Sequence, residues 1–168
     1  MSASRAAIVL RAANLDDIPF IMACERRPGY DAFVGHWPEE KHRTAMADAD
    51  FRYFLGCEGD EPRGFAILHQ HWLHPQNLYL KRIAVHDADR GYGRAFLSAL
   101  HDWIFANTDT HRFWLEVAQN NTRGRHLYES LGFVTEGVIR DAWSAPDGTR
   151  NSGIQMSLLK PDWLERRG

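Results

Sequence analysis

A glycine-containing turn between a strand pattern and a long helix pattern places the strongest constraint on the fold. The turn reads DRGYG over residues 89–93, and the apolar stretch Leu78–Val85 precedes it. Apolar residues then recur at spacings of three and four from Tyr92 to Trp103, which is typical of an α-helix with one buried face. A strand that leads directly into such a helix predicts an α/β layer structure.

Shorter patterns place further strands and helices around this unit. Asn14 is the expected cap of the first helix, and Pro28-Gly29 ends that helix. We expect further strands at 7–11, 51–57, 64–72, 113–117, 133–143 and 154–159, and further helices at 14–26, 38–47 and 122–131. The order βααβββαβαββ combines hairpins with strand–helix–strand units and predicts an α/β (α+β) fold with a mixed sheet.

Length and composition favour a single domain over residues 1–168. A chain of 168 residues with 44% hydrophobic content can bury one sizeable core. No linker rich in proline, glycine or serine divides it. The formal net charge is −2 and the two signs are interspersed, which argues against a nucleic-acid partner.

The same sequence features indicate a cytoplasmic protein. The apolar run at residues 6–10 is short for a signal-peptide core, and no stretch approaches the roughly 20 apolar residues of a membrane span. Cys24 and Cys57 share no motif. We interpret them as two buried thiols in a reducing compartment. We therefore expect no membrane partner.

The DRGYG turn is a candidate anion site. The first N–H groups of a helix have no partner within the helix, and the helix dipole makes this end positive. Glycine lets an anion approach the backbone closely, so a phosphate or diphosphate is the natural occupant. Arg90 and Arg94 add positive charge. Plain turn chemistry is the alternative interpretation of the two glycines.

The spacing excludes two common phosphate motifs. No Lys-Ser or Lys-Thr pair follows the turn, so it is not the GxxxxGK[ST] loop. Phe96 stands where GxGxxG requires its last glycine. A nucleotide-binding module that uses this turn stays open as a rival, although it would lack the usual lysine.

Residues 90–95 resemble the acyl-CoA loop (Q/R)xxGx(G/A) of the GNAT superfamily of N-acetyltransferases. Arg90, Gly93 and Ala95 occupy the matching positions. A second segment, LEVAQNNTRGRHLYESLGF at residues 115–133, resembles a later family segment, particularly in the branch that acetylates protein N-terminal amines. Gly124 is a departure, because alanine is usual there.

The resemblance implies acetyl-CoA as co-substrate, with no metal. It implies that the loop amides hold the diphosphate and that the preceding strand contacts the pantetheine arm through its backbone. Asn121 either caps its helix or contacts the arm. The cofactor-binding residues expected on this basis are Ile83, Ala84, Val85, Arg90, Gly91, Tyr92, Gly93, Arg94, Ala95, Asn121 and Tyr128.

Acetyl transfer to an amine needs a base for the amine and a proton for the departing thiolate. Glu116 is our candidate base, twelve residues before Tyr128 as in the N-terminal-acetylating relatives; a carboxylate that faces solvent or pairs with an arginine is the alternative. His111 and His126 are weaker candidates. Tyr128 is the candidate acid, but proton transfer from a phenol to a thiolate runs uphill by about 1.5 pKa units. It must therefore be tuned or mainly hydrogen-bond the sulfur, unless it is simply a core tyrosine.

The acceptor site is expected to lie between the loop at 26–37 and the last hairpin at 141–151, as the resemblance implies. These segments hold aromatic and acidic residues that suit a cationic amine, or else complete the core. The candidate substrate-binding aromatics are Tyr30, Phe33, Trp37 and Trp143, and the carboxylates are Glu25, Asp31 and Asp141.

Three further interpretations complete the prediction. A non-catalytic acyl-CoA-binding sensor would keep the loop without needing Tyr128. His69 and His71 share one strand face and could chelate a metal, but no acidic or cysteine ligand is nearby; a polar sheet face is the favoured alternative. No GxSxG nucleophile motif occurs. A homodimer is possible, since dimers are common in the family that the chain resembles.

Overall fold

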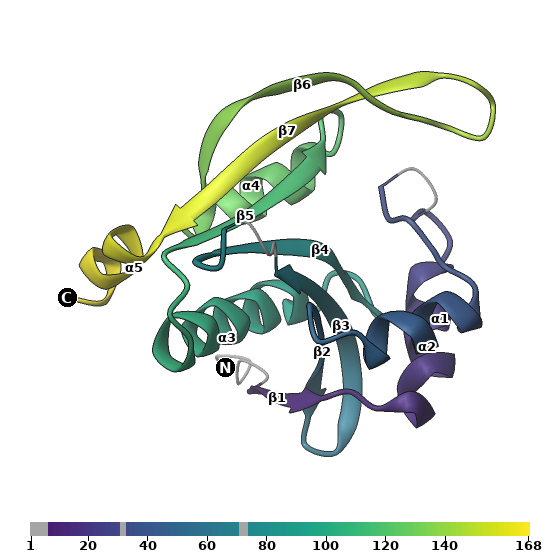
Figure 1. Ribbon diagram of the computed structural model, residues 1–168, viewed down its shortest axis with the longest axis horizontal. Helices are drawn as coiled ribbons and strands as arrows, with labels where there is room; N and C mark the ends of the chain where they lie inside the picture. The colour runs from purple at the N-terminus through teal and green to yellow at the C-terminus, as the bar shows by residue number, and fades with distance from the viewer. Residues whose placement is uncertain (1–6, 31–32, 71–73) are drawn as a thin grey trace.

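A seven-stranded mixed sheet, in the order β1-β2-β3-β4-β5-β7-β6, organises the computed structural model (Figure 1). The structure describes residues 7–30, 33–70 and 74–168. The strands are β1 Ile8–Ala12, β2 Phe51–Glu58, β3 Glu61–Gln70, β4 Asn77–Val85, β5 Arg112–Ala118, β6 Val134–Ser144 and β7 Arg150–Leu159. The helices are a 3-10 turn Leu15–Asp17, α1 Ile18–Glu25, α2 Glu39–Ala47, α3 Tyr92–Asn107, α4 Thr122–Ser130 and α5 Lys160–Arg167.

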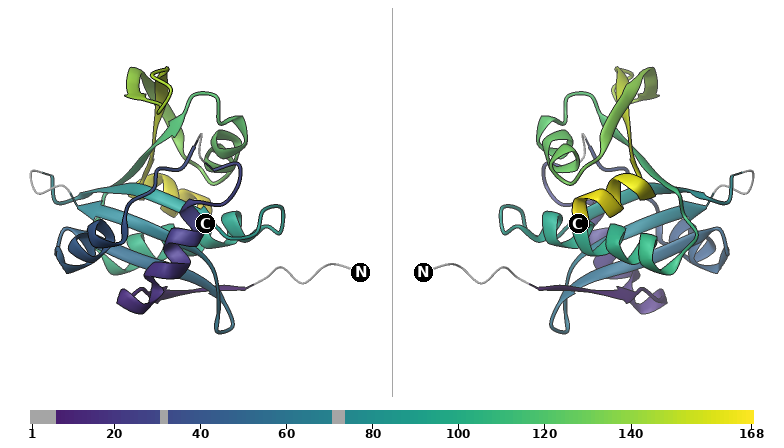
Figure 2. Two further views of the ribbon diagram at one scale, coloured as in Figure 1. Left: turned by 90° about the vertical axis from the view of Figure 1, so that its right-hand side faces the viewer. Right: turned by 90° about the vertical axis from the view of Figure 1, so that its left-hand side faces the viewer.

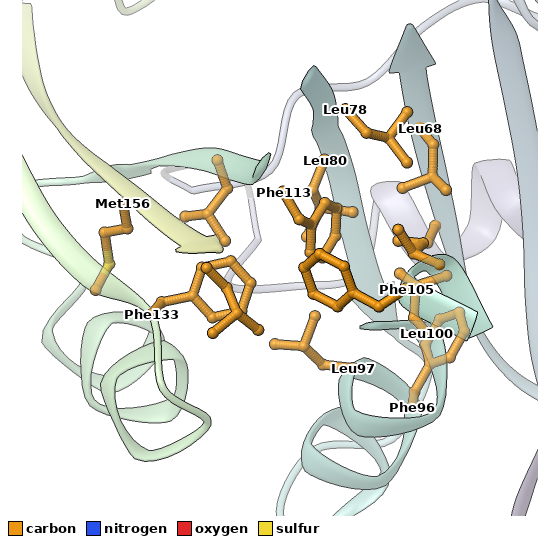
Figure 3. Close-up of a cluster of buried hydrophobic side chains, with 14 of the residues drawn as sticks. Leu68, Leu78, Leu80, Phe96, Leu97, Leu100, Phe105, Phe113, Phe133 and Met156 are labelled. Atoms are coloured by element: carbon orange, nitrogen blue, oxygen red, sulfur yellow. The ribbon is translucent and has the colours of Figure 1, made fainter. Parts of the chain in front are cut away.

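Both faces of the central strands are buried. Along β3, Ala66 and Leu68 join the cluster that packs on α3, whereas Phe65 and Ile67 join the cluster that packs on α1 and α2. Successive side chains of a strand point to opposite faces, so the unbroken apolar run of β3 follows from helices on both sides. Figure 3 shows the first cluster, in which leucines from the strands meet the aromatic and leucine side chains of α3.

The predicted order of strands and helices is confirmed, with two additions. The first helix begins with a 3-10 turn, where Asn14 Oδ1 accepts the Asp16 N–H at 2.8 Å as expected of a cap. The sequence prediction missed α5. Its start carries Pro161 and Asp162, which suit a first helical turn, and Trp163 anchors it by donating to Asp102 at 2.7 Å.

Strand β4 carries the irregularity that opens the sheet. Ile67 pairs with Arg82 and Leu68 pairs with Leu80, so Lys81 is a β-bulge without an opposite residue. Strand β4 pairs with β5 along three residues, Asn77–Tyr79, after which the two parallel strands separate. Figure 1 shows β5 turning away from β4 toward α4 and the β6–β7 hairpin. The remaining length of β4 therefore presents an unpaired backbone edge.

The β6–β7 hairpin extends away from the rest of the sheet, and the side views of Figure 2 show it standing with α4 above the other strands. Strand β6 lies at the sheet edge, and Val134 and Val138 are 56% and 53% exposed. Both cysteines are buried and free, in accord with the prediction. Within the described ranges, no helix has the length and hydrophobicity needed to cross a bilayer.

Candidate active site

A pocket opens where β4 and β5 separate. The loop between α1 and α2 closes one side of it, and α4 closes another. Its lining residues are Phe33, Val34, Gly35, Leu80, Lys81, Arg82, Ile83, Leu115, Glu116, Val117, Asn121 and Tyr128. The structure therefore brings together five residues that the sequence analysis predicted for the site: Phe33, Ile83, Glu116, Asn121 and Tyr128.

The turn before α3 presents open amides. Asp89 and Gly91 adopt left-handed φ angles of 65° and 75°, and the first helical hydrogen bond runs from the Ala95 N–H to the Gly91 carbonyl at 3.1 Å. Among the described residues, no acceptor pairs with the N–H groups at positions 92–94. A Cβ added at Gly93 would have one neighbour within 4 Å, a methyl group of Leu127 at 3.7 Å. The helix end is therefore free to receive an anion.

The side chains of the turn have different tasks. Tyr92 is buried, and its hydroxyl donates to Glu58 at 2.9 Å. Arg94 donates to Ser130 Oγ at 2.6 Å. These two residues can reach an anion through their backbone amides, whereas the Arg90 side chain is exposed and makes no ion pair within the described residues.

Ile83, Ala84 and Val85, the three predicted residues on β4, differ in whether their backbone groups point toward β3 or away from it. Val85 points its backbone away from β3, because its carbonyl accepts the Tyr30 hydroxyl at 3.0 Å and its N–H donates to the same oxygen at 3.4 Å. Arg27 also donates to this carbonyl, at 2.9 Å. Ladder groups alternate along an antiparallel strand, so Ile83 points the same way and Ala84 points toward β3. Ile83 is therefore the open position, and Tyr30 covers Val85.

Asn121 is a helix cap that also lines the pocket. Its Oδ1 accepts the Gly124 N–H at 2.9 Å, which supports the capping interpretation. A Cβ at Gly124 would lie 2.7 Å from Asn121 Nδ2. The glycine at this unusual position thus leaves room for the carboxamide to fold over the first turn of α4.

Tyr128 and Glu116 face the pocket without hydrogen-bond partners among the described residues. Burial, reinforced by the nearby Tyr30, raises the pKa of Tyr128 to about 12. Burial also raises the pKa of Glu116, and Lys81 acts in the opposite direction. Tyr128 is thus a neutral donor, and Glu116 is a stronger base than an ordinary glutamate.

The acceptor-side aromatics lie against the protein's own cations. Lys41 Nζ, Arg82 Cζ and Lys81 Nζ lie 4.5, 4.8 and 5.2 Å from the centre of the Trp37 ring. Arg27 Cζ lies 3.8 Å from the centre of the Tyr30 ring. Phe33 is 43% exposed and lines the pocket.

Two other predicted acceptor residues lie elsewhere. Trp143 is on β6, and its ring passes beside Gly153, outside the pocket lining. Asp141 is exposed, and its N–H donates to Ser152 at 3.1 Å. Asp31 lies outside the described residues.

Glu25 belongs to a buried network rather than to an open acceptor surface. Its carboxylate is fully buried and accepts from Arg82 at 2.5 Å, from Arg26 at 3.3 Å and from the Trp37 N–H at 3.3 Å. His42 Nε2 lies 3.1 Å away, and His42 Nδ1 lies 3.0 Å from the Tyr53 hydroxyl. Hydrogen bonding and the charges of His42 and Arg82 outweigh burial and lower the Glu25 pKa.

Sequence reasoning missed Lys81 and Arg82. Two adjacent charged residues interrupt the apolar alternation of β4, a pattern that signals a bulge or a turned side chain inside a strand. That signal could have identified both residues as part of the pocket.

The candidate histidine metal site gains no support at His69. This ring stacks on Phe51 with the ring centres 4.2 Å apart, whereas His71 lies outside the described residues. Within the ranges that the structure describes, no group of three histidine, cysteine, aspartate or glutamate side chains could hold a metal ion.

The chain is similar to known N-acetyltransferases. It is 35% identical over 69 residues to a [ribosomal protein bS18]-alanine N-acetyltransferase of Haemophilus ducreyi, covering 41% of this chain and about half (47%) of that relative. It is 26% identical over 172 residues to a spermidine N(1)-acetyltransferase of Vibrio cholerae, covering 95% of this chain and 96% of the relative.

The fold agrees with these matches. The solved structure of spermidine N-acetyltransferase from Vibrio cholerae in complex with CoA and spermine superposes with a TM-score of 0.81 at 22% identity, covering 94% of this chain and 98% of that one. Residues 19–133 match the model of the acetyltransferase (GNAT) family. Since this match spans more than half of the sequence, the chain belongs to the GNAT family of acetyltransferases.

Proposed function

We propose that the protein transfers the acetyl group of acetyl-CoA to a primary amine by direct attack of the amine. The observation that carries this proposal is the pocket between β4 and β5, which brings Ile83 of the free β4 edge together with Glu116 and Tyr128, while the open amides of α3 follow the end of the same strand. Acetyl-CoA supplies the activated acyl thioester. The protein supplies position, hydrogen-bond donors and proton handling.

The start of α3 fits the diphosphate of the cofactor. The amides of Tyr92, Gly93 and Arg94 and the helix dipole favour negative charge at this point. The exposed Arg90 side chain adds a positive charge. A bulky residue at Gly93 would fill the space that the diphosphate needs.

The free edge of β4 fits the amide groups of an extended pantetheine arm. An extended chain can add to a sheet edge through main-chain hydrogen bonds, and Ile83 offers such groups. Val85 can do so once Tyr30 and Arg27 leave its carbonyl.

Glu116 is proposed as the general base. At pH 7, neutralising a lysine-like amine costs about 4.6 kcal/mol, and neutralising an α-amine costs about 1.4 kcal/mol. A carboxylate with a raised pKa, which lines the pocket without an ion-pair partner in the described chain, can accept this proton directly or through water.

Tyr128 is proposed to stabilise the departing sulfur. Full proton transfer from a phenol with a pKa of about 12 to a thiolate with a conjugate-acid pKa of about 8.5 costs about 5 kcal/mol. A hydrogen bond from the neutral phenol avoids this cost and still stabilises developing negative charge. Of the two roles predicted for this tyrosine, the hydrogen bond to sulfur is therefore favoured.

A ligand and turnover test addresses the proposal. Acetyl-CoA at about 100 times its Kd should raise the melting temperature by about 5 to 11 °C, and ATP should not. Gly93→Trp should abolish that shift, whereas Gly137→Trp, at an exposed glycine of β6 with open space around it, should preserve it. Thiol release with an amine would establish transfer; a shift without release by any acceptor would favour the sensor alternative.

A homodimer and a cytoplasmic location stay predictions. The outer edge of β6, with exposed Val134 and Val138, supports association with a second copy. Analytical ultracentrifugation of the wild type and of a Val134→Asp/Val138→Asp variant measures this directly, because a dimer through β6 would dissociate in the variant.

A further inference from the structure

Of the chain's three lysines, one lines the pocket and a second lies beside it. Lys41 belongs to α2, Lys81 is the bulge residue of β4, and the third, Lys160, begins α5. Lys81 lines the pocket, while Lys41 lies on the Trp37 ring that Lys81 also contacts. Lys81 is four residues before Val85, so it lies about 13 Å along the strand from the end next to α3. An acyl group and its acceptor would meet at this distance from α3, beside Lys81.

The cations in and beside the pocket are incompletely neutralised. Arg82 is paired with the buried Glu25, but Lys81 and Lys41 have no carboxylate within ion-pair distance among the described residues. Glu116 of β5 is the pocket carboxylate that acts on Lys81 electrostatically. Lys81 is half-buried, and burial together with Arg82 and Lys41 lowers its pKa. The local field therefore disfavours additional positive charge.

We propose that Lys81, supported by Lys41, binds a carboxylate of the acceptor and makes the enzyme selective for amines that carry a nearby anionic group. This inference rests on the proposed acetyl transfer. The bulge turns Lys81 into the pocket, and the Trp37 ring supports both ammonium groups. The acceptor amine then lies beside Glu116, and the carboxylate pairs with Lys81. A polyamine would place a second cation against Lys81 and Arg82, which is unfavourable.

Matched acceptors can measure this selectivity. Alanine and alaninamide differ in the α-carboxylate, while Ala-Asp and Ala-Asn peptides with blocked C-termini differ in a side-chain carboxylate. Spermidine supplies the polycation. The α-carboxylate stabilises the ammonium form of alanine, so a preference for alanine over alaninamide would run against intrinsic amine reactivity. The two pairs distinguish a free amino acid from an acidic peptide as the source of the carboxylate.

We expect kcat/KM from thiol release to favour the carboxylate member of one pair by about 10-fold or more, as for a hydrogen bond to a charged group. Lys81→Met should remove the preference, Lys81→Glu should favour spermidine, and the matched control Lys160→Met should change nothing. Lys41→Met should reduce the preference and replaces Lys81→Met if that variant does not fold. The carboxylate acceptor should lose affinity in Lys81→Met while the acetyl-CoA melting shift stays.

Several results would overturn the inference. Equal or better turnover of the uncharged member in both pairs, faster turnover of spermidine, or a preference that survives Lys81→Met would each do so. If acetyl transfer occurs without the preference, this inference alone fails. If acetyl-CoA neither shifts the melting temperature nor releases thiol with any acceptor, the proposed function fails as well.

Discussion

The turn before α3 and the pocket between β4 and β5 are built in different ways. In the turn before α3, the backbone amides at positions 92–94 have no acceptor among the described residues. In and beside the pocket, side chains from three separate elements, Lys41, Lys81 and Glu116, define the charge. A site made of backbone amides depends on the geometry of the turn and tolerates many side chains. A site made of side chains depends on the residues that pack against and pair with each of them. The turn before α3 and the pocket should therefore respond differently to mutation.

The largest effect on stability should come from the buried network around Glu25, which holds Arg82 beside the pocket. Glu25→Ala leaves Arg82 without its partner in the interior and should cost about 3–5 kcal/mol of unfolding free energy. The control Glu39→Ala breaks an exposed pair with Arg43 and should cost less than about 1 kcal/mol. Urea denaturation measures both. Similar losses in the two variants would contradict a special supporting role for Glu25.

The same network predicts a pH dependence of stability. The Glu25 pKa is lowered in the folded state, so its contribution is fully present above the unfolded pKa of about 4.5 and is lost as pH falls through the folded value.

Tyr128→Phe should come next in size. Loss of one donor to developing negative charge typically costs about 10²–10³-fold in kcat, whereas the acetyl-CoA melting shift should stay because the α3 amides are untouched. Single-turnover kinetics and thermal shift separate these quantities. Full turnover on a true acceptor would remove Tyr128 from the mechanism.

Glu116→Gln should lower kcat by about 100-fold and alter its pH dependence. Because burial raises the Glu116 pKa, the wild-type rate should fall as acid protonates the base, at a higher pH than for an ordinary glutamate. The variant should lack this limb. The same acceptor must be used for both enzymes, so that titration of the amine is common to the two profiles; identical profiles would exclude Glu116 as the base.

Tyr30→Phe should have the smallest effect and opposite sign. The Tyr30 hydroxyl occupies the Val85 carbonyl and N–H, so removing it should tighten CoA binding by about 2- to 10-fold, the value of one net hydrogen bond. Tyr79→Phe is the control, since Tyr79 stacks on Trp114 and its hydroxyl has no described hydrogen bond. Weaker binding in Tyr30→Phe would mean that the tyrosine helps to hold the cofactor.

The geometry of the turn before α3 could be predicted from sequence because its determinants are local, while its role as a diphosphate site stays a prediction. Gly91 and Gly93 lie between a strand and an amphipathic helix, which predicts a turn. Gly93 also occupies the glycine position of the family motif. The positions of Asn121 and Tyr128 could also be predicted, because Asn121 caps α4 and Tyr128 lies on the same short helix. The element order followed from periodicity, with α5 missed because its anchor, Trp163, packs on a distant helix.

The distribution of charge in and beside the pocket could not be predicted in the same way. The aromatics and Glu25 suggested a site for a cation, but long-range packing places Arg82 on the Glu25 carboxylate and three cations around Trp37. Sequence reveals residue types, whereas the charge left over after pairing depends on contacts between α1, α2 and β4. The β-bulge at Lys81, which decides what that residue faces, is likewise a property of strand pairing.

The most direct test of the central claim is a titration of ¹⁵N-labelled protein with CoA, followed by amide chemical shifts. Diphosphate binding at the start of α3 predicts that the largest changes fall on the amides of Tyr92, Gly93 and Arg94, and that pantetheine, which lacks the diphosphate, leaves them nearly unchanged. Saturable binding of CoA with these three amides unmoved would contradict it.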